Sequence, residues 1–314
     1  MEHLFVASCD QEGGILSFCL DEEGSLKLTG RTPLDRPMYL CSEGSTVYAL
    51  LREPFWQQSG VVKLQINPEG TLTQLGPVCP TNGSISCHIL SFAGHIYTAN
   101  YMSGSVTRLP DRVMSFPDRG NRPQQARSHP HCLTPTPDEK YICICDLGTD
   151  CIYIVNEELE EVSRTRVKPG SGPRHLVFSK HTGYGYCINE LSSELSVFSY
   201  QGGKLTLLGS ERCIPEDFAT MHYPSAIRLN SQGTRLYTAN RGHESVCIWD
   251  VEKDRLSGRR FVGTGGSMPR EMNVIGRWLL CGNNECLTVV SEDTGMVTDR
   301  VMIKKPWCIL PVKV

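Results

Sequence analysis

One short pattern recurs along the chain: a proline, one variable residue, and then the start of an apolar segment. It occurs six times, as PMYLCS from Pro37, PHCLTP from Pro130, PRHLVF from Pro173, PSAIRL from Pro224, PREMNV from Pro269 and PWCILP from Pro306. Each of the first five copies is followed by a second short apolar segment, such as KYICIC or RLYTAN. A fixed period of this kind is typical of repeat architectures, in which each unit is one small supersecondary structure.

Further short strands complete most units, as ELSVFSY and KLTLLGS do after the third copy, so each unit holds four strands in about 45 residues. HIYTAN, from His95, marks a unit that lacks the proline. The first strands of the chain, HLFVAS, GILSFC and SLKLTG, lack an innermost strand, and the last segment, PWCILPVKV, lacks partners. We therefore predict an all-β, seven-bladed β-propeller over residues 1–314, one domain with four-stranded antiparallel blades, whose ring is closed by the C-terminal strand joining the N-terminal blade.

Charge and composition exclude several kinds of partner and compartment. The chain has 31 Lys and Arg against 34 Asp and Glu, a net charge of −3, so it has no overall basic field to attract nucleic acid or an anionic membrane. It has neither a signal-like N-terminus nor an apolar run of about 18 residues. Its fifteen cysteines form no CxxC pair and are expected to be small buried hydrophobes. We expect a cytoplasmic protein with neither nucleic acid nor membrane as partner.

Two sets of residues are expected to surround one mouth of the propeller. In a blade, the start of the innermost strand and the turn after the second strand emerge on the same face, which is the usual ligand face. The first set follows the recurring prolines and consists of Met38, His131, Arg174, Ser225, Arg270 and Trp307. The second set follows the second strands and consists of Tyr101, Asp146, Glu190 and Arg241.

Five of these residues come from successive blades and are predicted to converge on one side of the mouth: His131, Arg174, Glu190, Arg241 and Arg270. Like charges brought together repel one another unless an anion or a carboxylate is present, so this cluster predicts an anionic ligand.

The remaining motifs point to no other chemistry. Met38 and Trp307 are expected on the far side of the ring, where they should matter less. The sequence has no phosphate-binding loop, dinucleotide-binding motif, nucleophile elbow or HExxH motif. His129 and His131 lack the further ligands that a metal would need, so we expect neither a metal nor a cofactor.

The longer motifs resemble the lactonase-type seven-bladed propellers, a family that includes propeller-type cytosolic 6-phosphogluconolactonases and fungal carboxy-muconate cyclases. The strings that carry the resemblance include SHPHCLTPTPDEKYICICDLGTDCIYIV, GSGPRHLVFS, YCINELSSELSVF and PSAIRLNSQGTRLYTANRGHESVCIWDV. The resemblance implies functional roles for His131, Arg174, Glu190 and Arg241. Cys132 departs from the small polar residue usual after the histidine, and the first two blades match only loosely, which leaves their part in substrate choice open.

The resemblance implies hydrolysis of 6-phospho-D-glucono-1,5-lactone, a small anionic sugar lactone, in the pentose phosphate pathway. On this hypothesis Glu190 is the general base that activates water, with His131 as the alternative base or as donor to the oxyanion or leaving oxygen. Arg174 and Arg241 would bind the carbonyl or the phosphate, and Arg270 the phosphate. Two other functions stay open: a lactone-forming cyclase or cycloisomerase acting on a muconate-like carboxylate, and a propeller that binds an anion or a protein without catalysis.

Overall fold

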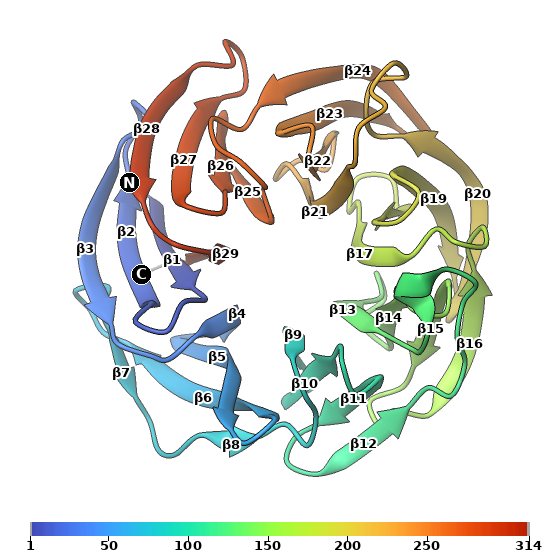
Figure 1. Ribbon diagram of the computed structural model, residues 1–314, viewed down its shortest axis with the longest axis horizontal. Coiled ribbons are helices and arrows are strands. Elements are labelled where there is room, and N and C mark those ends of the chain that lie inside the picture. Colours follow the sequence, from blue (N-terminus) through green and yellow to red (C-terminus); the bar gives the residue numbers. More distant parts are fainter. Residues whose placement is uncertain (1, 313–314) are drawn as a thin grey trace.

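Seven four-stranded antiparallel sheets are arranged in a ring in the computed structural model, which describes residues 2–312 (Figure 1). The strand nearest the axis opens each sheet: β4 (Pro37–Glu43), β9 (Ser86–Phe92), β13 (Pro130–Pro135), β17 (Pro173–Phe178), β21 (Tyr223–Leu229), β25 (Glu271–Ile275) and β29 (Pro306–Val312). The second strands are β5 (Thr46–Phe55), β10 (His95–Asn100), β14 (Ile142–Asp146), β18 (Gly185–Asn189), β22 (Arg235–Arg241), β26 (Trp278–Gly282) and β1 (Glu2–Ser8). The predicted all-β, seven-bladed fold is confirmed.

The outer half of each sheet holds the third and fourth strands. The third strands are β6 (Gln58–Ile66), β11 (Ser105–Arg108), β15 (Cys151–Val155), β19 (Glu194–Gln201), β23 (Ser245–Glu252), β27 (Cys286–Ser291) and β2 (Gly14–Leu20). The fourth strands are β7 (Leu72–Gln74), β12 (Arg112–Ser115), β16 (Glu161–Arg166), β20 (Lys204–Arg212), β24 (Arg255–Gly263), β28 (Val297–Met302) and β3 (Leu26–Thr32). A short extra strand, β8 (Cys79–Pro80), pairs with β6, and one 3₁₀ turn, η1, spans Pro123–Gln125.

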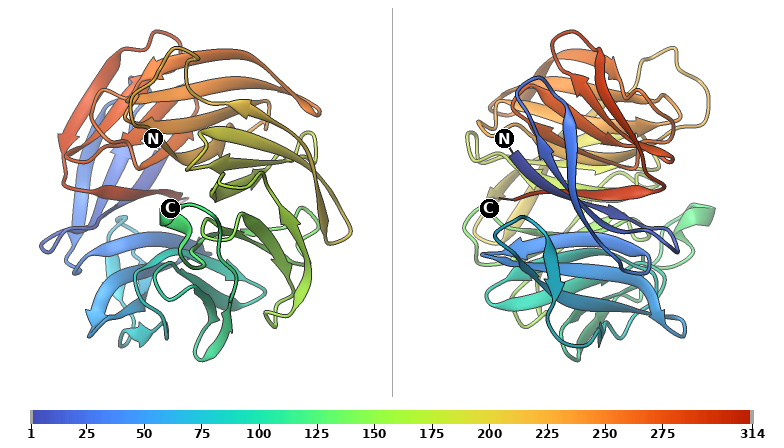
Figure 2. Two further views of the ribbon diagram at one scale, coloured as in Figure 1. Left: turned by 45° about the vertical axis from the view of Figure 1, so that its right-hand side comes forward. Right: turned by 90° about the vertical axis from the view of Figure 1, so that its left-hand side faces the viewer.

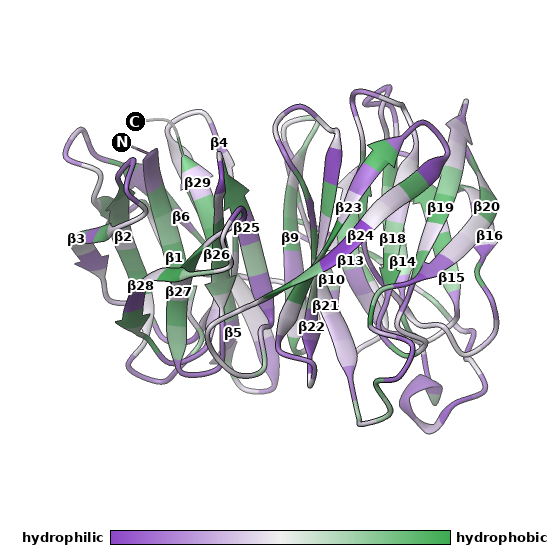
Figure 3. Cartoon of the chain, turned by 90° about the horizontal axis from the view of Figure 1, so that it is seen from above, coloured by the Kyte–Doolittle hydropathy of each residue, from purple (hydrophilic) through white to green (hydrophobic). Residues whose placement is uncertain are grey.

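Burial follows the position of a strand within its blade. Every residue of β14 and β15 is buried, because both faces of these strands pack against neighbouring blades. The outer strand β16 alternates between exposed and partly buried residues instead. Hydrophobic residues accordingly lie along strands such as β1, β2 and β27 in Figure 3. All fifteen cysteines are free and thirteen of them are buried, as the sequence predicts.

The C-terminal strand closes the ring as predicted. β29 pairs with β1 in antiparallel register, from His3 opposite Val312 to Ala7 opposite Cys308, so the first and last strands of the chain share one sheet. Figure 2 shows β29 lying against β1. Lys313 and Val314, which the predicted closing strand included, lie outside the described residues. No helix within residues 2–312 is long and apolar enough to cross a membrane.

The recurring proline marks a β-bulge at the start of the inner strand. In β17, Pro173 faces Asn189 and His175 faces Ile188, so Arg174 is an extra residue without a partner of its own. The same irregularity follows the first proline of β4 and of β13. A bulge turns its extra side chain away from the regular ladder. The residue after the proline is thereby turned toward the mouth of the ring.

Candidate active site

A cavity of about 380 Å³ lies at the mouth where the inner strands begin. Both predicted sets of residues contribute to its lining, which consists of Met38, Cys87, His131, Arg270 and Trp307 from the starts of inner strands, Arg52, Tyr101 and Glu190 from the ends of second strands, and Ile85 and Met102 from turns. The structure therefore brings His131, Glu190 and Arg270 together in one cavity.

Glu190 is the carboxylate of this cavity, and two arginines hold it. It directly follows β18, and its backbone N–H donates to the carbonyl oxygen of Gly172 at 2.8 Å. Its Oε2 atom lies 2.8 Å from Nε of Arg174 and 3.0 Å from Nη2 of Arg241. Its Oε1 atom has no hydrogen bond within residues 2–312. One carboxylate oxygen is thus fixed while the other is free to act on a ligand.

Arg174, which binds Glu190, is itself held by two further hydrogen bonds. Its side chain is only 2 % exposed, and its Nη1 donates to the carbonyl oxygen of Ser225 and to Nε2 of His175, the latter at 3.2 Å. The bond to Nε2 requires the neutral tautomer of His175 that carries its proton on Nδ1. Nη2 of Arg174 has no hydrogen bond to another described residue, so one donor of this guanidinium stays available.

Arg241 holds the same carboxylate from the next blade. Its Nε donates to the carbonyl oxygen of Tyr223 at 2.9 Å, and its Nη2 also reaches the carbonyl oxygen of Pro224 at 3.3 Å. Its side chain is 12 % exposed. Nη1 has no hydrogen bond to the residues that the structure describes. Arg174 and Arg241 therefore position Glu190 and keep one free nitrogen each.

The charges around the cavity set the protonation states of its two candidate bases. Burial alone would raise the pKa of Glu190, but attraction to Arg241, Arg174 and Arg270 outweighs burial and brings that pKa below its ordinary 4.5. Burial, together with repulsion from Arg174 and Arg270, lowers the pKa of His131 well below 6.5. At neutral pH the site therefore holds an ionised Glu190 and an uncharged His131.

His131 has an unsatisfied ring nitrogen. Its side chain is buried against the rings of Tyr101 and His175, whose centroids lie 5.6 Å and 5.2 Å away. Nδ1 nonetheless has no hydrogen-bond partner among residues 2–312. Leaving such a group unpaired costs about 1–3 kcal/mol, so a ligand that supplies a hydrogen-bond partner gains binding free energy.

Arg270 and Trp307 line the same cavity and contact each other. The guanidinium of Arg270 lies 4.4 Å from the ring centroid of Trp307 and makes no ion pair within the described chain. Burial, with repulsion from Arg174 and Arg241, lowers the pKa of Arg270 to about 10, which still leaves it charged at neutral pH. Met38 lines the same cavity. The expectation that Trp307 and Met38 lie on the far side is wrong, because ring closure places β29 and β4 next to the cluster.

The prediction that Asp146 belongs to the mouth is also wrong, by one position. Asp146 and Asn189 end the corresponding strands β14 and β18, so the residue that matches Glu190 is Leu147. Asp146 is fully buried instead, and its Oδ1 accepts a hydrogen bond from the backbone N–H of His129 at 2.7 Å. Its carboxylate shapes the turn and does not face the cavity.

Arg52 is a residue of the mouth that the sequence analysis missed. Leu51 faces Pro37 in β4 as Asn189 faces Pro173 in β17, so Arg52 occupies the position that Glu190 occupies in its own blade. The sequence does indicate this position: the second-strand segment TVYALLR aligns with the second-strand segment RLYTANR, which places Arg52 opposite Arg241 in the alignment.

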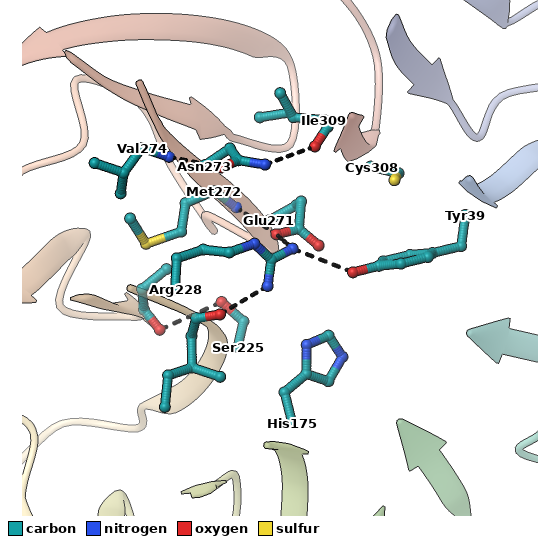
Figure 4. A network of polar contacts seen from close by, with 12 residues as sticks. Tyr39, His175, Ser225, Arg228, Glu271, Met272, Asn273, Val274, Cys308 and Ile309 are labelled. Atoms are coloured by element: carbon teal, nitrogen blue, oxygen red, sulfur yellow. Dashed lines mark hydrogen bonds and ion pairs between the residues drawn. The ribbon is translucent and has the colours of Figure 1, made fainter. Parts of the chain in front are cut away.

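A separate ion pair joins two inner strands, β21 and β25. Arg228 donates from Nη2 to Oε1 of Glu271 at 2.6 Å and to the hydroxyl of Tyr39 at 3.1 Å (Figure 4). Glu271 is almost completely buried. Because Glu271 is already paired with Arg228, it is not available to neutralise the arginines of the mouth. No three His, Cys, Asp or Glu side chains among residues 2–312 are grouped to hold a metal ion.

The comparisons with known proteins agree with the fold. The family described as Lactonase, 7-bladed beta-propeller matches residues 3–310. The chain belongs to this family. A periplasmic gluconolactonase of Pseudomonas aeruginosa superposes on this lactonase-family chain with a TM-score of 0.90 at 25% identity, covering 100% of this chain and 99% of the other.

Two further relatives extend the comparison. A Bacteroides fragilis protein, provisionally described as a 6-phosphogluconolactonase, superposes with a TM-score of 0.86 at 27% identity and covers 99% of this chain and 98% of its own. An uncharacterized Staphylococcus epidermidis protein is 31% identical over 93% of this chain and 92% of its own length. The predicted family membership is therefore confirmed.

Proposed function

We propose that this lactonase-family chain hydrolyses 6-phospho-D-glucono-1,5-lactone to 6-phosphogluconate in the mouth cavity. The observation that carries the proposal is one ionised carboxylate, Glu190, paired with arginines from two blades beside a cavity of about 380 Å³ that Arg270 of a third blade also lines. The family and the gluconolactonase of P. aeruginosa support the reaction class.

In the proposed mechanism Glu190 is the general base. Its free Oε1 accepts a proton from water while the water oxygen bonds to the lactone carbonyl carbon, and the carbonyl oxygen becomes an oxyanion. The free nitrogens of Arg174 and Arg241 donate hydrogen bonds to that oxyanion. The bond from the carbonyl carbon to the ring oxygen then breaks, and the ring oxygen takes up the proton that Glu190 accepted from water, which forms the product hydroxyl and regenerates the carboxylate.

In this mechanism His131 donates a hydrogen bond to the ring oxygen of the lactone. Its uncharged, buried imidazole has an unpartnered Nδ1 atom beside the cavity, which suits a hydrogen bond to substrate. It is also the alternative base, since an uncharged imidazole accepts a proton. Arg270, without a carboxylate partner, is assigned to the substrate phosphate. The reaction needs no covalent nucleophile.

The proposed setting is the pentose phosphate pathway in the cytoplasm. Fifteen free cysteines, most of them buried, fit a reducing compartment. Product formation from a phosphorylated sugar lactone also fits a pathway whose intermediates are sugar phosphates.

Turnover of defined lactones tests the proposal. The hydrolysis of 6-phospho-D-glucono-1,5-lactone is measured from the protons that it releases, and the rate of spontaneous hydrolysis is subtracted. We expect saturable acceleration with the phosphorylated lactone. Lactone formation from a carboxylated muconate without lactone hydrolysis would instead identify a cyclase, and tight product binding without turnover would identify a binding propeller.

A further inference from the structure

The cavity holds more positive charge than its carboxylate can balance. Glu190 neutralises part of the charge of Arg174 and Arg241, whereas Arg270 and Arg52 line the cavity without an ion pair to any described residue. Like charges in a partly buried site repel one another. A ligand with more than one negative charge relieves that repulsion better than a singly charged one.

Arg52 is unpaired because its neighbour takes the nearby carboxylates. The Nη1 and Nη2 atoms of Arg36 lie 3.4 Å from Glu53, the acidic residue next to Arg52 in the sequence, and 3.0 Å from Asp35. The backbone N–H of Arg52 donates to the carbonyl oxygen of Arg36 at 3.1 Å, so the two arginines sit side by side. The charge of Arg36 is neutralised by Asp35 and Glu53, whereas Arg52 lines the cavity.

The backbone around Arg52 is held in place on both sides. Besides the bond to Arg36, its carbonyl oxygen accepts a hydrogen bond from Oγ of Ser59 at 2.6 Å. The regular pairing of β5 with β6 stops at Leu51 opposite Gly60 and resumes only at Phe55. Arg52 is therefore the first residue beyond the regular ladder, with a fixed backbone and a side chain directed to the mouth.

We propose that Arg52, together with Arg270, binds the phosphate of the lactone substrate and thereby determines specificity for a phosphorylated substrate. This inference rests on the proposed function, since it assigns the charged end of the same substrate. Glu190 and the two arginines that hold it act on the carbonyl, and Arg52 and Arg270 then face the doubly charged phosphate at the other end. Guanidinium groups suit phosphate because they donate paired hydrogen bonds in one plane.

The assignment also gives the first complete blade a role in substrate choice. Arg52 is the only cavity-lining arginine within residues 2–312 that comes from the blade of β4–β7. A chain with a neutral residue at this position would keep the carbonyl end of the site and lose half of the proposed phosphate end.

The test compares Arg52→Gln with Arg112→Gln. Both variants remove one guanidinium, but Arg52 lines the cavity, whereas Arg112 lies on the outer strand β12 and pairs with Glu158 at 2.8 Å. The values of kcat and KM are measured for 6-phospho-D-glucono-1,5-lactone and for D-glucono-1,5-lactone. We expect the ratio of kcat/KM between the phosphorylated and unphosphorylated lactones to fall about ten- to a hundredfold in Arg52→Gln, mainly through KM, and to stay unchanged in Arg112→Gln.

Calorimetry keeps the inference testable without turnover. Binding of 6-phosphogluconate and of gluconate is measured for the wild type and both variants, after thermal unfolding has shown that the variants are folded. We expect Arg52→Gln to weaken 6-phosphogluconate about tenfold or more relative to gluconate. An unchanged preference in Arg52→Gln, an equal loss in Arg112→Gln, or a wild type without preference for the phosphorylated ligand would overturn the assignment. A wild type that prefers 6-phosphogluconate but opens no lactone would instead refute the proposed function alone.

Discussion

Glu190 shares one carboxylate oxygen between two arginines, and this sharing determines the proton chemistry open to the cavity. The arginines keep the carboxylate ionised at neutral pH and fix its direction, but they also make it a weaker base. The residue types at this cluster were predictable from the sequence, because bulge and turn positions repeat from blade to blade. Their hydrogen bonds were not, since Arg174 and Arg241 had been expected to contact substrate, whereas each uses most of its donors on Glu190 and on protein backbone or ring atoms.

The first prediction concerns pH. Because arginines lower the pKa of Glu190 below 4.5, its active, ionised form is lost only as the pH falls through that lower value. His131 is uncharged at neutral pH, since burial and the nearby arginines hold its pKa well below 6.5. We expect kcat to be flat from about pH 5.5 to 8 and to fall only at more acidic pH. A midpoint between about pH 6 and 7 in the initial rates would contradict these protonation states.

The second prediction concerns Arg241, the cation that attracts Glu190 most strongly. Arg241→Gln removes that attraction, so the pKa of Glu190 rises and the acid limb of kcat moves to higher pH. Arg259→Gln is the control, because Arg259 belongs to the same sheet but pairs with Glu216 on the surface at 3.4 Å. An acid limb at the same pH in wild type and Arg241→Gln would show that this limb does not report Glu190.

At the scale of elements, the proline at or near the start of six of the seven inner strands explains most of what the sequence predicted. It marks a bulge, and the bulge directs Met38, His131 and Arg174 to the mouth. The ends of second strands were harder to place, because a shift of one residue reverses which side chain faces the cavity. Asp146 was misplaced in this way. Arg52 was overlooked because the first complete blade matches the other repeats less closely.

The third prediction concerns β29, which supplies the innermost strand of the closing sheet. Truncation after Lys305 removes its pairing with β1 and exposes the core against which Cys308 and Ile309 are buried. We expect the midpoint of thermal unfolding to fall by more than about 10 °C, because the truncation removes a whole strand and leaves β1 with an unpaired edge. Met302→Ala, at an exposed position of β28, should leave the midpoint unchanged. A truncated chain with the wild-type midpoint would contradict closure by β29.

At the scale of the whole molecule, a chain with a net charge of −3 carries a local excess of arginine at one mouth. The ring geometry produces this contrast, because several blades contribute residues to one small cavity, and Glu190 is the only acidic residue in its described lining. The number of blades and their closure were predictable from the repeat. The pairing of Arg36 with Asp35 and Glu53, which leaves Arg52 free, depends on side-chain geometry that no repeat encodes.

The fourth prediction concerns metals. The proposed mechanism takes its base, its donors and its cations from side chains, so the lactonase activity should survive exhaustive chelation. Activity is measured before and after dialysis against a chelator, with the fold followed by circular dichroism. A loss of activity that one divalent ion restores would contradict the mechanism and direct attention to His129 and His131.

Glu190→Gln tests the central claim most directly. The substitution preserves the size of the side chain but removes its ability to accept a proton from water. With the variant shown to be folded, we expect kcat for 6-phospho-D-glucono-1,5-lactone to fall about a hundred- to ten-thousandfold, KM to move little and the acid limb to disappear. A variant that keeps more than about a third of the wild-type kcat would contradict Glu190 as the base and assign that role to His131.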